Sequence, residues 1–79
     1  MRLDKYLKIS RLIKRRTVAC DACNAGRISV NDTVRKAGYE VKTGDIIAIA
    51  FGERSVRVRV LSTDEFVTKD GAKEMYEEL

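Results

Sequence analysis

The chain has 79 residues, of which 44% are apolar and 35% are charged, and its formal net charge is +4. This length suits one small domain with a modest core, and the sequence lacks an apolar run long enough for a transmembrane span. The N-terminus has neither the apolar stretch nor the cleavage site of a signal peptide, so a cytosolic location is expected. Histidine is absent, which removes the commonest general base and neutral metal ligand, and we expect no enzyme.

Positive charge is concentrated in the first half of the chain. Residues 1–36 contain ten Lys or Arg and three Asp or Glu, whereas residues 37–79 contain six and nine. Segregated basic charge is typical of nucleic-acid-binding domains, although the same residues can also form an ordinary solvated surface. The densest part is residues 1–16, with seven basic residues and one acid, Asp4.

The first segment predicts a basic amphipathic helix. Apolar residues from Leu3 to Ile13 share one side of a helical wheel, and basic residues follow the other side. Leu12 falls among the charges, so we expect the helix to end or bend near Ser10–Ile13. The basic residues 14–16 would then lie in or beside a turn, where their side chains can converge.

A second helix is predicted between Thr17 and Gly26. Thr17 is the candidate N-cap because its hydroxyl can accept a hydrogen bond from an unpaired backbone N–H, and Gly26 is the expected left-handed stop. Cys20 and Cys23 form a C-x-x-C motif inside this helix, with Cys23 toward the core and Cys20 toward solvent. The sequence offers no further Cys or His to complete a zinc site, so we expect no metal.

The remaining sequence predicts a small sheet. Residues 27–30 alternate in polarity, Asn31-Asp32 favours a tight turn, and a short hairpin continues into residues 33–35. A turn at residues 42–45 precedes Ile46–Phe51, whose mostly apolar run is consistent with a central strand. Residues 52–55 turn the chain again.

The C-terminal part combines an alternating strand with an acidic end. Val56–Val60 alternates valine with arginine, which predicts one apolar and one cationic face. The arginines at positions 54, 57 and 59 either protect an edge strand from aggregation or contact phosphate. The segment Ala72–Leu79 is predicted to form a short terminal helix, which needs packing to be stable.

Several of these residues resemble the RNA-binding domain named after ribosomal small-subunit protein S-four. The match covers residues 1–51 with two departures. Asp32 stands where this superfamily usually has glycine after asparagine, and Ala22-Cys23 replaces bulkier aliphatic residues. The matching motifs are Arg2-Leu3-Asp4-x-x-Leu7, Arg16-x-x-Ala19, Gly26-x-x-x-Val30-Asn31 and Val41-Lys42-x-Gly44-Asp45.

Within this superfamily, the chain resembles two groups of small stand-alone proteins. They are the RqcP family of ribosome-associated quality control proteins, which it resembles more, and a ribosome-binding heat-shock family. The resemblance implies an α+β fold of the S-four-like (alpha-L) type, with two N-terminal helices packed on a small twisted antiparallel sheet and a short C-terminal helix. We expect the RNA-binding domain to span residues 1–62, with a C-terminal extension over residues 63–79, and the protein to be a monomer.

The resemblance to the RqcP family also implies a function. The protein is expected to bind large-subunit ribosomal RNA and a P-site peptidyl-tRNA, without a cofactor. It would support an RqcH-type elongation partner that adds C-terminal alanine tails to stalled nascent chains. The alternatives are a heat-shock-type recycling factor for obstructed large subunits, a general DNA- or RNA-binding module, and a protein adaptor that acts through its acidic tail, residues 74–79.

The predicted RNA contacts combine the basic N-terminal residues with three positions around the hairpin. Arginine suits such a surface because its planar fork can bind two phosphate oxygens or stack on a base, and N–H groups near Thr17 can bind a phosphate. Asp4 is predicted to orient an arginine, and Tyr6 to pack in the core rather than stack on a base. The predicted residues are Arg2, Lys5, Lys8, Arg11, Lys14, Arg15, Arg16, Thr17, Arg27, Asn31 and Lys36.

Overall fold

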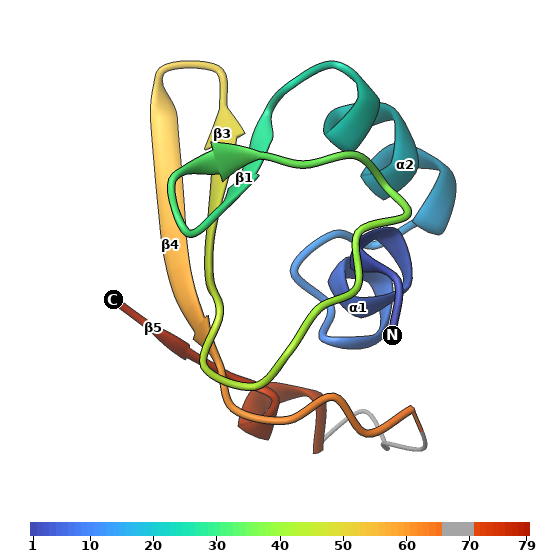
Figure 1. The fold of residues 1–79 in the computed structure, drawn as a ribbon, viewed down its shortest axis with the longest axis vertical. Helices are drawn as coiled ribbons and strands as arrows, with labels where there is room; N and C mark the ends of the chain where they lie inside the picture. The colour runs from blue at the N-terminus through green and yellow to red at the C-terminus, as the bar shows by residue number, and fades with distance from the viewer. Residues whose placement is uncertain (66–70) are drawn as a thin grey trace.

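The structure of the chain, a computed structural model, describes residues 1–65 and 71–79, and in these residues two helices precede an antiparallel sheet. Figure 1 shows α1 and α2 together on one side of the molecule and the strands curving along the other. The predicted α+β fold is therefore confirmed. The elements are α1 (Leu3–Ile9), α2 (Arg16–Asn24), β1 (Ile28–Val30), β2 (Thr33–Val34), β3 (Ile46–Phe51), β4 (Arg54–Val60), the 3-10 helix η1 (Gly71–Glu74) and β5 (Tyr76–Glu78).

The five strands form one antiparallel sheet in the order β2-β1-β3-β4-β5, so β3 is the central strand, as predicted. Val30 of β1 lies opposite Ile47 of β3, which lies opposite Val58 of β4. All three side chains are buried, because residues at paired positions point to the same face of a sheet. This row forms the floor of the core beneath the helices.

The helices cover that face with large side chains from α1 and small ones from α2. Leu3, Tyr6 and Leu7 are fully buried, as are Ala19 and Cys23 of α2. The prediction that Tyr6 packs in the core is confirmed, and its hydroxyl donates a hydrogen bond to the Met75 carbonyl at 2.7 Å. This bond ties the first helix to the residue that precedes β5.

Local turn chemistry ends α2 and shapes the first hairpin. Gly26 has a φ of +78°, and the N–H of Arg27 bonds to the Ala22 carbonyl at 3.0 Å, which closes the helix in the predicted way. Asn31 and Asp32 have φ values of 52° and 68°. Both signs are those of a type I′ turn, and Asp32 adopts this conformation in place of the usual glycine because a short polar side chain tolerates it.

The start of the second helix differs from the prediction. α2 begins at Arg16, and its N-cap is Arg15, whose φ of −125° and ψ of 135° are extended. Thr17 already has helical geometry, so its prediction as the N-cap is wrong. Within the described residues, no side chain caps this helix end with a hydrogen bond.

Two predictions about the C-terminal half are also wrong, one of them in part. β5 pairs with β4 over Val58–Val60, so Arg59 does not lie at a sheet edge, whereas residues 54–56 at the start of β4 pair with β3 alone. Of the segment Ala72–Leu79, only the end of η1 is helical, and Tyr76–Glu78 forms β5 instead. Pairing with β4 satisfies the backbone groups that a free sheet edge would expose, whereas a short isolated helix is unstable.

The predicted division of the chain at residue 62 stays a prediction, and β5 of the predicted extension belongs to the same sheet as β4. Residues 66–70 of that extension lie outside the described residues. Within residues 1–65 and 71–79, each helix is too short and too polar to cross a bilayer.

Candidate nucleic-acid interface

The segment between the two helices turns sharply around an apolar anchor. Ile13 is only 7% exposed, and its N–H donates a hydrogen bond to the Leu7 carbonyl at 3.0 Å. Arg11 has a φ of 63°, which non-glycine residues rarely adopt, and this conformation reverses the chain directly after α1. The helix therefore ends where predicted, and the side chains of Lys14 and Arg15 are exposed.

A buried carboxylate joins the starts of the two helices. Asp4 Oδ1 accepts a hydrogen bond from Arg2 Nε at 3.2 Å, and Asp4 Oδ2 accepts one from Arg16 Nε at 3.4 Å. The side chain of Asp4 is 5% exposed, whereas those of Arg2 and Arg16 are 55% and 48% exposed. The prediction that Asp4 orients an arginine is confirmed, and it contacts two.

This arrangement prepares two guanidinium groups for an anionic ligand. Each guanidinium contacts Asp4 through Nε, so its two terminal nitrogens can form the paired hydrogen bonds that phosphate accepts. Part of the side-chain entropy that binding would remove is already lost in the free protein, which favours affinity. We call Arg2 and Arg16 the arginine pair.

The other basic residues of α1 lie beside the arginine pair in different environments. Lys8 is exposed in the last turn of the helix, where a cation interacts favourably with the helix dipole. Lys5 Nζ forms an ion pair with Glu65 Oε1 at 3.1 Å, and the two side chains are 35% and 44% exposed. An exposed pair of this kind contributes little stability, so a phosphate can replace Glu65.

Thr17 and Arg27 are both exposed, but they lie at opposite ends of α2. Thr17 lies in the first turn, near N–H groups that point out of the helix end. Arg27 lies between the helix and β1, where its carbonyl accepts a hydrogen bond from Ala50. Thr17 is therefore next to Arg16 of the arginine pair, whereas Arg27 lies beyond the far end of α2.

Asn31 has a structural contact that sequence reasoning missed. Its side-chain amide donates to Asp45 Oδ1 at 3.1 Å and accepts a hydrogen bond from the Ile46 N–H at 3.0 Å. Asp45 also accepts hydrogen bonds from the Tyr39 hydroxyl and the Lys42 N–H. Asn31 therefore connects the hairpin to the start of β3, and its contact with RNA stays a prediction.

Lys36 lies near the end of α2, where its Nζ donates to the Asn24 carbonyl at 3.4 Å. Next to it, the Arg35 guanidinium lies 4.9 Å from the centre of the Tyr39 ring, a cation–π contact. Hydrogen bonding to Asp45 and burial raise the pKa of Tyr39, with burial the larger cause. Arg35 was missing from the predicted set although it precedes Lys36 directly.

The arginines of β4 lie apart from the arginine pair. Val58 and Val60 face the core, so Arg57 and Arg59 point to the opposite face of the sheet. Figure 1 shows β4 across the molecule from α1. Arg59 also forms an ion pair with Glu77 of β5 at 3.1 Å.

The two cysteines are free thiols, one buried and one partly exposed. Burial, and to a smaller extent the charge of Asp4, raise the pKa of Cys23 to about 11, so its thiol stays protonated at neutral pH. The described part of the chain contains no cluster of three or more His, Cys, Asp or Glu that could hold a metal ion.

The structure also contains an apolar cleft that the sequence analysis did not predict. It lies between the segment after α1, helix α2 and the end of β3, next to the exposed Lys14. Leu12, which falls among charges on the helical wheel, is half-buried here and packs against the core. Its irregular position was the one sequence signal of this cleft.

Comparison with known proteins connects this surface to one family. The family model of the S4 domain matches residues 1–47, which include both helices and the first hairpin. The RQC P-site tRNA stabilizing factor of Halalkalibacterium halodurans is 53% identical over 77 residues, which cover 98% of this chain and 88% of that protein. The Heat shock protein 15 homolog of Aeromonas salmonicida is 35% identical over 65 residues, covering 82% of this chain and 49% of that protein.

The fold is shared with a solved structure. Heat Shock Protein 15 of Vibrio cholerae superposes with a TM-score of 0.91 over 100% of this chain and 81% of that one, at 24% identity. At this identity the likeness shows the fold alone.

Proposed function

Because the chain belongs to the S4 domain family and, within it, to the family of the RQC P-site tRNA stabilizing factors, we propose that it is a non-catalytic RNA-binding protein of the large ribosomal subunit. Its ligand is large-subunit ribosomal RNA together with a peptidyl-tRNA in the P site. A cytoplasmic location follows from the ribosome as partner. The protein acts as a monomer that stabilises this complex and carries out no chemistry.

The observation that carries the proposal is the contact of one buried acid with two half-exposed arginines, one just before α1 and one at the start of α2. Such a site fits two phosphates at a set spacing, and structured RNA is recognised mainly through its shape and backbone. The neighbouring exposed residues Lys14 and Arg15 add charge on the same side of the helix junction. These features support a structured-RNA ligand more than an evenly charged surface would.

The proposed cellular role is support of ribosome-associated quality control. By holding the peptidyl-tRNA in the P site, the protein lets an RqcH-type elongation partner add C-terminal alanine tails to a stalled nascent chain. The name of the Halalkalibacterium halodurans relative, which refers to stabilization of P-site tRNA, supports this role.

A second candidate function is recycling of obstructed large subunits. The similarity to the Heat shock protein 15 homolog of Aeromonas salmonicida favours it. Both functions use the same RNA surface, so they are separated by their products and not by where the protein binds.

Co-sedimentation with large subunits, followed by analysis of nascent chains, tests the proposal. The tagged protein should sediment with large subunits that carry peptidyl-tRNA, and deletion of its gene should remove alanine tails. An intact wild-type gene should restore the tails, and the Arg16→Ala variant should not. If the protein instead sediments with free large subunits, and deletion of its gene leaves the alanine tails unchanged, the recycling function is favoured.

Competition separates ribosomal binding from general nucleic-acid binding. Large subunits should displace a labelled sample of the protein from duplex DNA at much lower concentration than duplex DNA displaces it from subunits. Equal competition by the two would contradict the ribosomal proposal and favour the general DNA- or RNA-binding module.

A further inference from the structure

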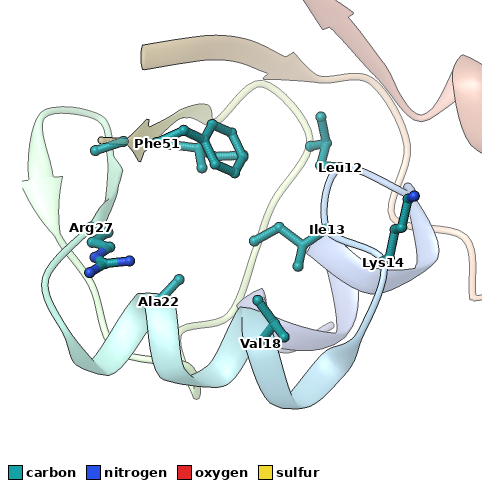
Figure 2. A pocket seen from close by; sticks show the side chains of 9 residues that line it. Leu12, Ile13, Lys14, Val18, Ala22, Arg27 and Phe51 are labelled. Carbon is teal, nitrogen blue, oxygen red and sulfur yellow. The ribbon is translucent and has the colours of Figure 1, made fainter. Parts of the chain in front are cut away.

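An apolar cleft of about 250 Å³ lies between the segment after α1, helix α2 and the end of β3. Figure 2 shows the apolar side chains of Leu12, Ile13, Val18, Ala22 and Phe51 around one open space. They come from the segment after α1, from α2 and from the end of β3. The cleft is smaller than the roughly 300–1,000 Å³ pockets of drug-sized ligands, so it suits a single flat ring system.

Two large apolar side chains of the cleft are left half-exposed. Phe51 is 47% exposed and Val18 is 51% exposed. Removal of apolar surface from water is favourable in free energy. Exposed apolar residues that lie in a group mark binding sites more often than isolated ones do. A ligand in the cleft would cover both side chains.

The charges around the cleft define the chemistry of that ligand. Lys14 and Arg27 lie at two ends of the cleft in Figure 2, and among the described residues that line it none is acidic. Lys14 is next to Arg15 and Arg16 in sequence, so it links the cleft to the candidate interface along the chain. The matching ligand has an apolar flat body with an anionic group on either side.

We propose that the cleft binds one unstacked base of the bound RNA, whose flanking phosphates contact Lys14 and Arg27; this site rests on the proposed RNA-binding function. The ring of Phe51 provides the aromatic surface on which the base stacks. Because the lining side chains other than Lys14 and Arg27 carry no hydrogen-bonding groups, the site accepts a base without reading its identity. The site therefore selects an RNA with a nucleotide free to leave its stack.

Affinity for large subunits carrying peptidyl-tRNA tests the role of Phe51. Phe51→Leu keeps an apolar side chain but removes the ring, and should weaken binding roughly five-fold or more, as loss of base stacking does. Phe51→Trp restores a ring and should bind within about two-fold of the wild type. The salt dependence of binding should be the same for all three proteins, because no charge changes.

A matched control tests whether loss of any exposed apolar side chain, outside the cleft as well, weakens binding. Val34→Ala changes a residue of β2 that is 56% exposed and lies outside the cleft, and its affinity should equal that of the wild type. Thermal melts followed by circular dichroism should show that each variant folds. Ala22→Leu narrows the cleft without changing Phe51 and should also weaken binding.

A photo-crosslinker identifies the ligand in the cleft. With p-benzoylphenylalanine in place of Phe51, irradiation of the subunit complex should attach the protein to an unpaired RNA nucleotide. Attachment to a ribosomal protein instead would overturn the proposal and indicate a protein ligand. Binding of Phe51→Leu at wild-type affinity would overturn it as well.

Arg16→Ala distinguishes failure of the base site from failure of the proposed RNA-binding function. If Arg16→Ala weakens binding and Phe51→Leu does not, the base site is wrong and the RNA-binding function stands. If neither variant weakens binding, the proposed RNA-binding function is wrong, and the base site that rests on it is wrong as well.

Discussion

Asp4 Oδ2 accepts a hydrogen bond from Arg16 Nε at 3.4 Å, which connects the first turn of α1 to the first turn of α2. The other carboxylate oxygen contacts Arg2, and the Lys5 N–H donates to it as well. A buried charge is tolerated when it is paired and hydrogen-bonded, and Asp4 meets both conditions. The position of the arginine pair therefore depends on this one acid.

The substitution Asp4→Asn separates positioning from net charge. It makes the protein more positive, so a purely electrostatic surface would bind RNA more tightly. Loss of the carboxylate should instead release the arginine pair and weaken binding to large subunits by about 1 kcal/mol, or roughly five-fold. The dissociation constant from a filter or gradient assay measures the change.

Asp21→Asn is the matched control for that substitution. Asp21 is an exposed acid of α2, so its replacement changes the net charge by the same amount. This variant should bind as tightly as the wild type or slightly more tightly. Equal affinity of the Asp4 and Asp21 variants would show that Asp4 has no positioning role.

Arg16→Ala should weaken binding to large subunits far more than Arg57→Ala. Loss of a charge-assisted hydrogen bond to phosphate costs about 1.5–3 kcal/mol, or at least roughly ten-fold in affinity. Arg57 alternates with the buried Val58 and therefore points to the opposite face of the sheet, so its removal should change affinity by less than about two-fold. Equal losses from both would contradict a single RNA-binding face.

Binding should weaken steeply as salt concentration rises, because several phosphates are contacted at once. The logarithm of the association constant should fall linearly with the logarithm of salt concentration, and Arg16→Ala should reduce that slope by about 1. Titrations at four or more salt concentrations measure it. A flat dependence in the wild type would argue against RNA as the ligand.

Tyr6→Phe should destabilise the protein without affecting RNA binding. The substitution removes the hydroxyl that donates to the Met75 carbonyl, which keeps its hydrogen bonds from the Leu61 and Ser62 N–H groups. Loss of this one hydrogen bond should lower the free energy of unfolding by about 0.5–1.5 kcal/mol. Urea denaturation measures the loss, and an unchanged midpoint would mean that the bond does not hold β5 to α1 in solution.

Stability should fall in alkaline solution partly through Cys23. Its pKa is raised from 9.0 to about 11 in the folded protein, so above pH 9 the unfolded thiol loses its proton first. The contribution to stability is complete below pH 9 and is lost as pH rises to about 11, with a slope of up to about 1.4 kcal/mol per pH unit.

Cys23→Ala isolates this contribution from other groups that titrate in the same range. Between pH 9 and pH 11 the unfolding free energy of the variant should decline less steeply than that of the wild type. Parallel declines would show that the Cys23 thiol has the same proton affinity in both states.

Local sequence signals predicted most of the elements. The stop at Gly26, the turn at Asn31-Asp32 and the strand Ile46–Phe51 depend on neighbouring residues, and each is observed where it was expected. Thr17 shows the limit of such signals. A residue type favoured at helix ends suggested the N-cap, but packing of the segment after α1 places Arg15 there instead.

Periodicity and composition were thus enough to establish a small α+β domain with basic N-terminal helices. The spacing of the motifs was enough to recognise membership of the S4 domain family. These signals were not enough to place β5, whose pairing depends on the free edge of β4, a feature of the assembled sheet. The contacts of Asp4 with Arg16 and the meeting of Leu12, Val18 and Phe51 around a cleft depend on how α1 crosses α2 above β3. Such contacts join distant residues, and they form only when burial of the shared core brings the elements together.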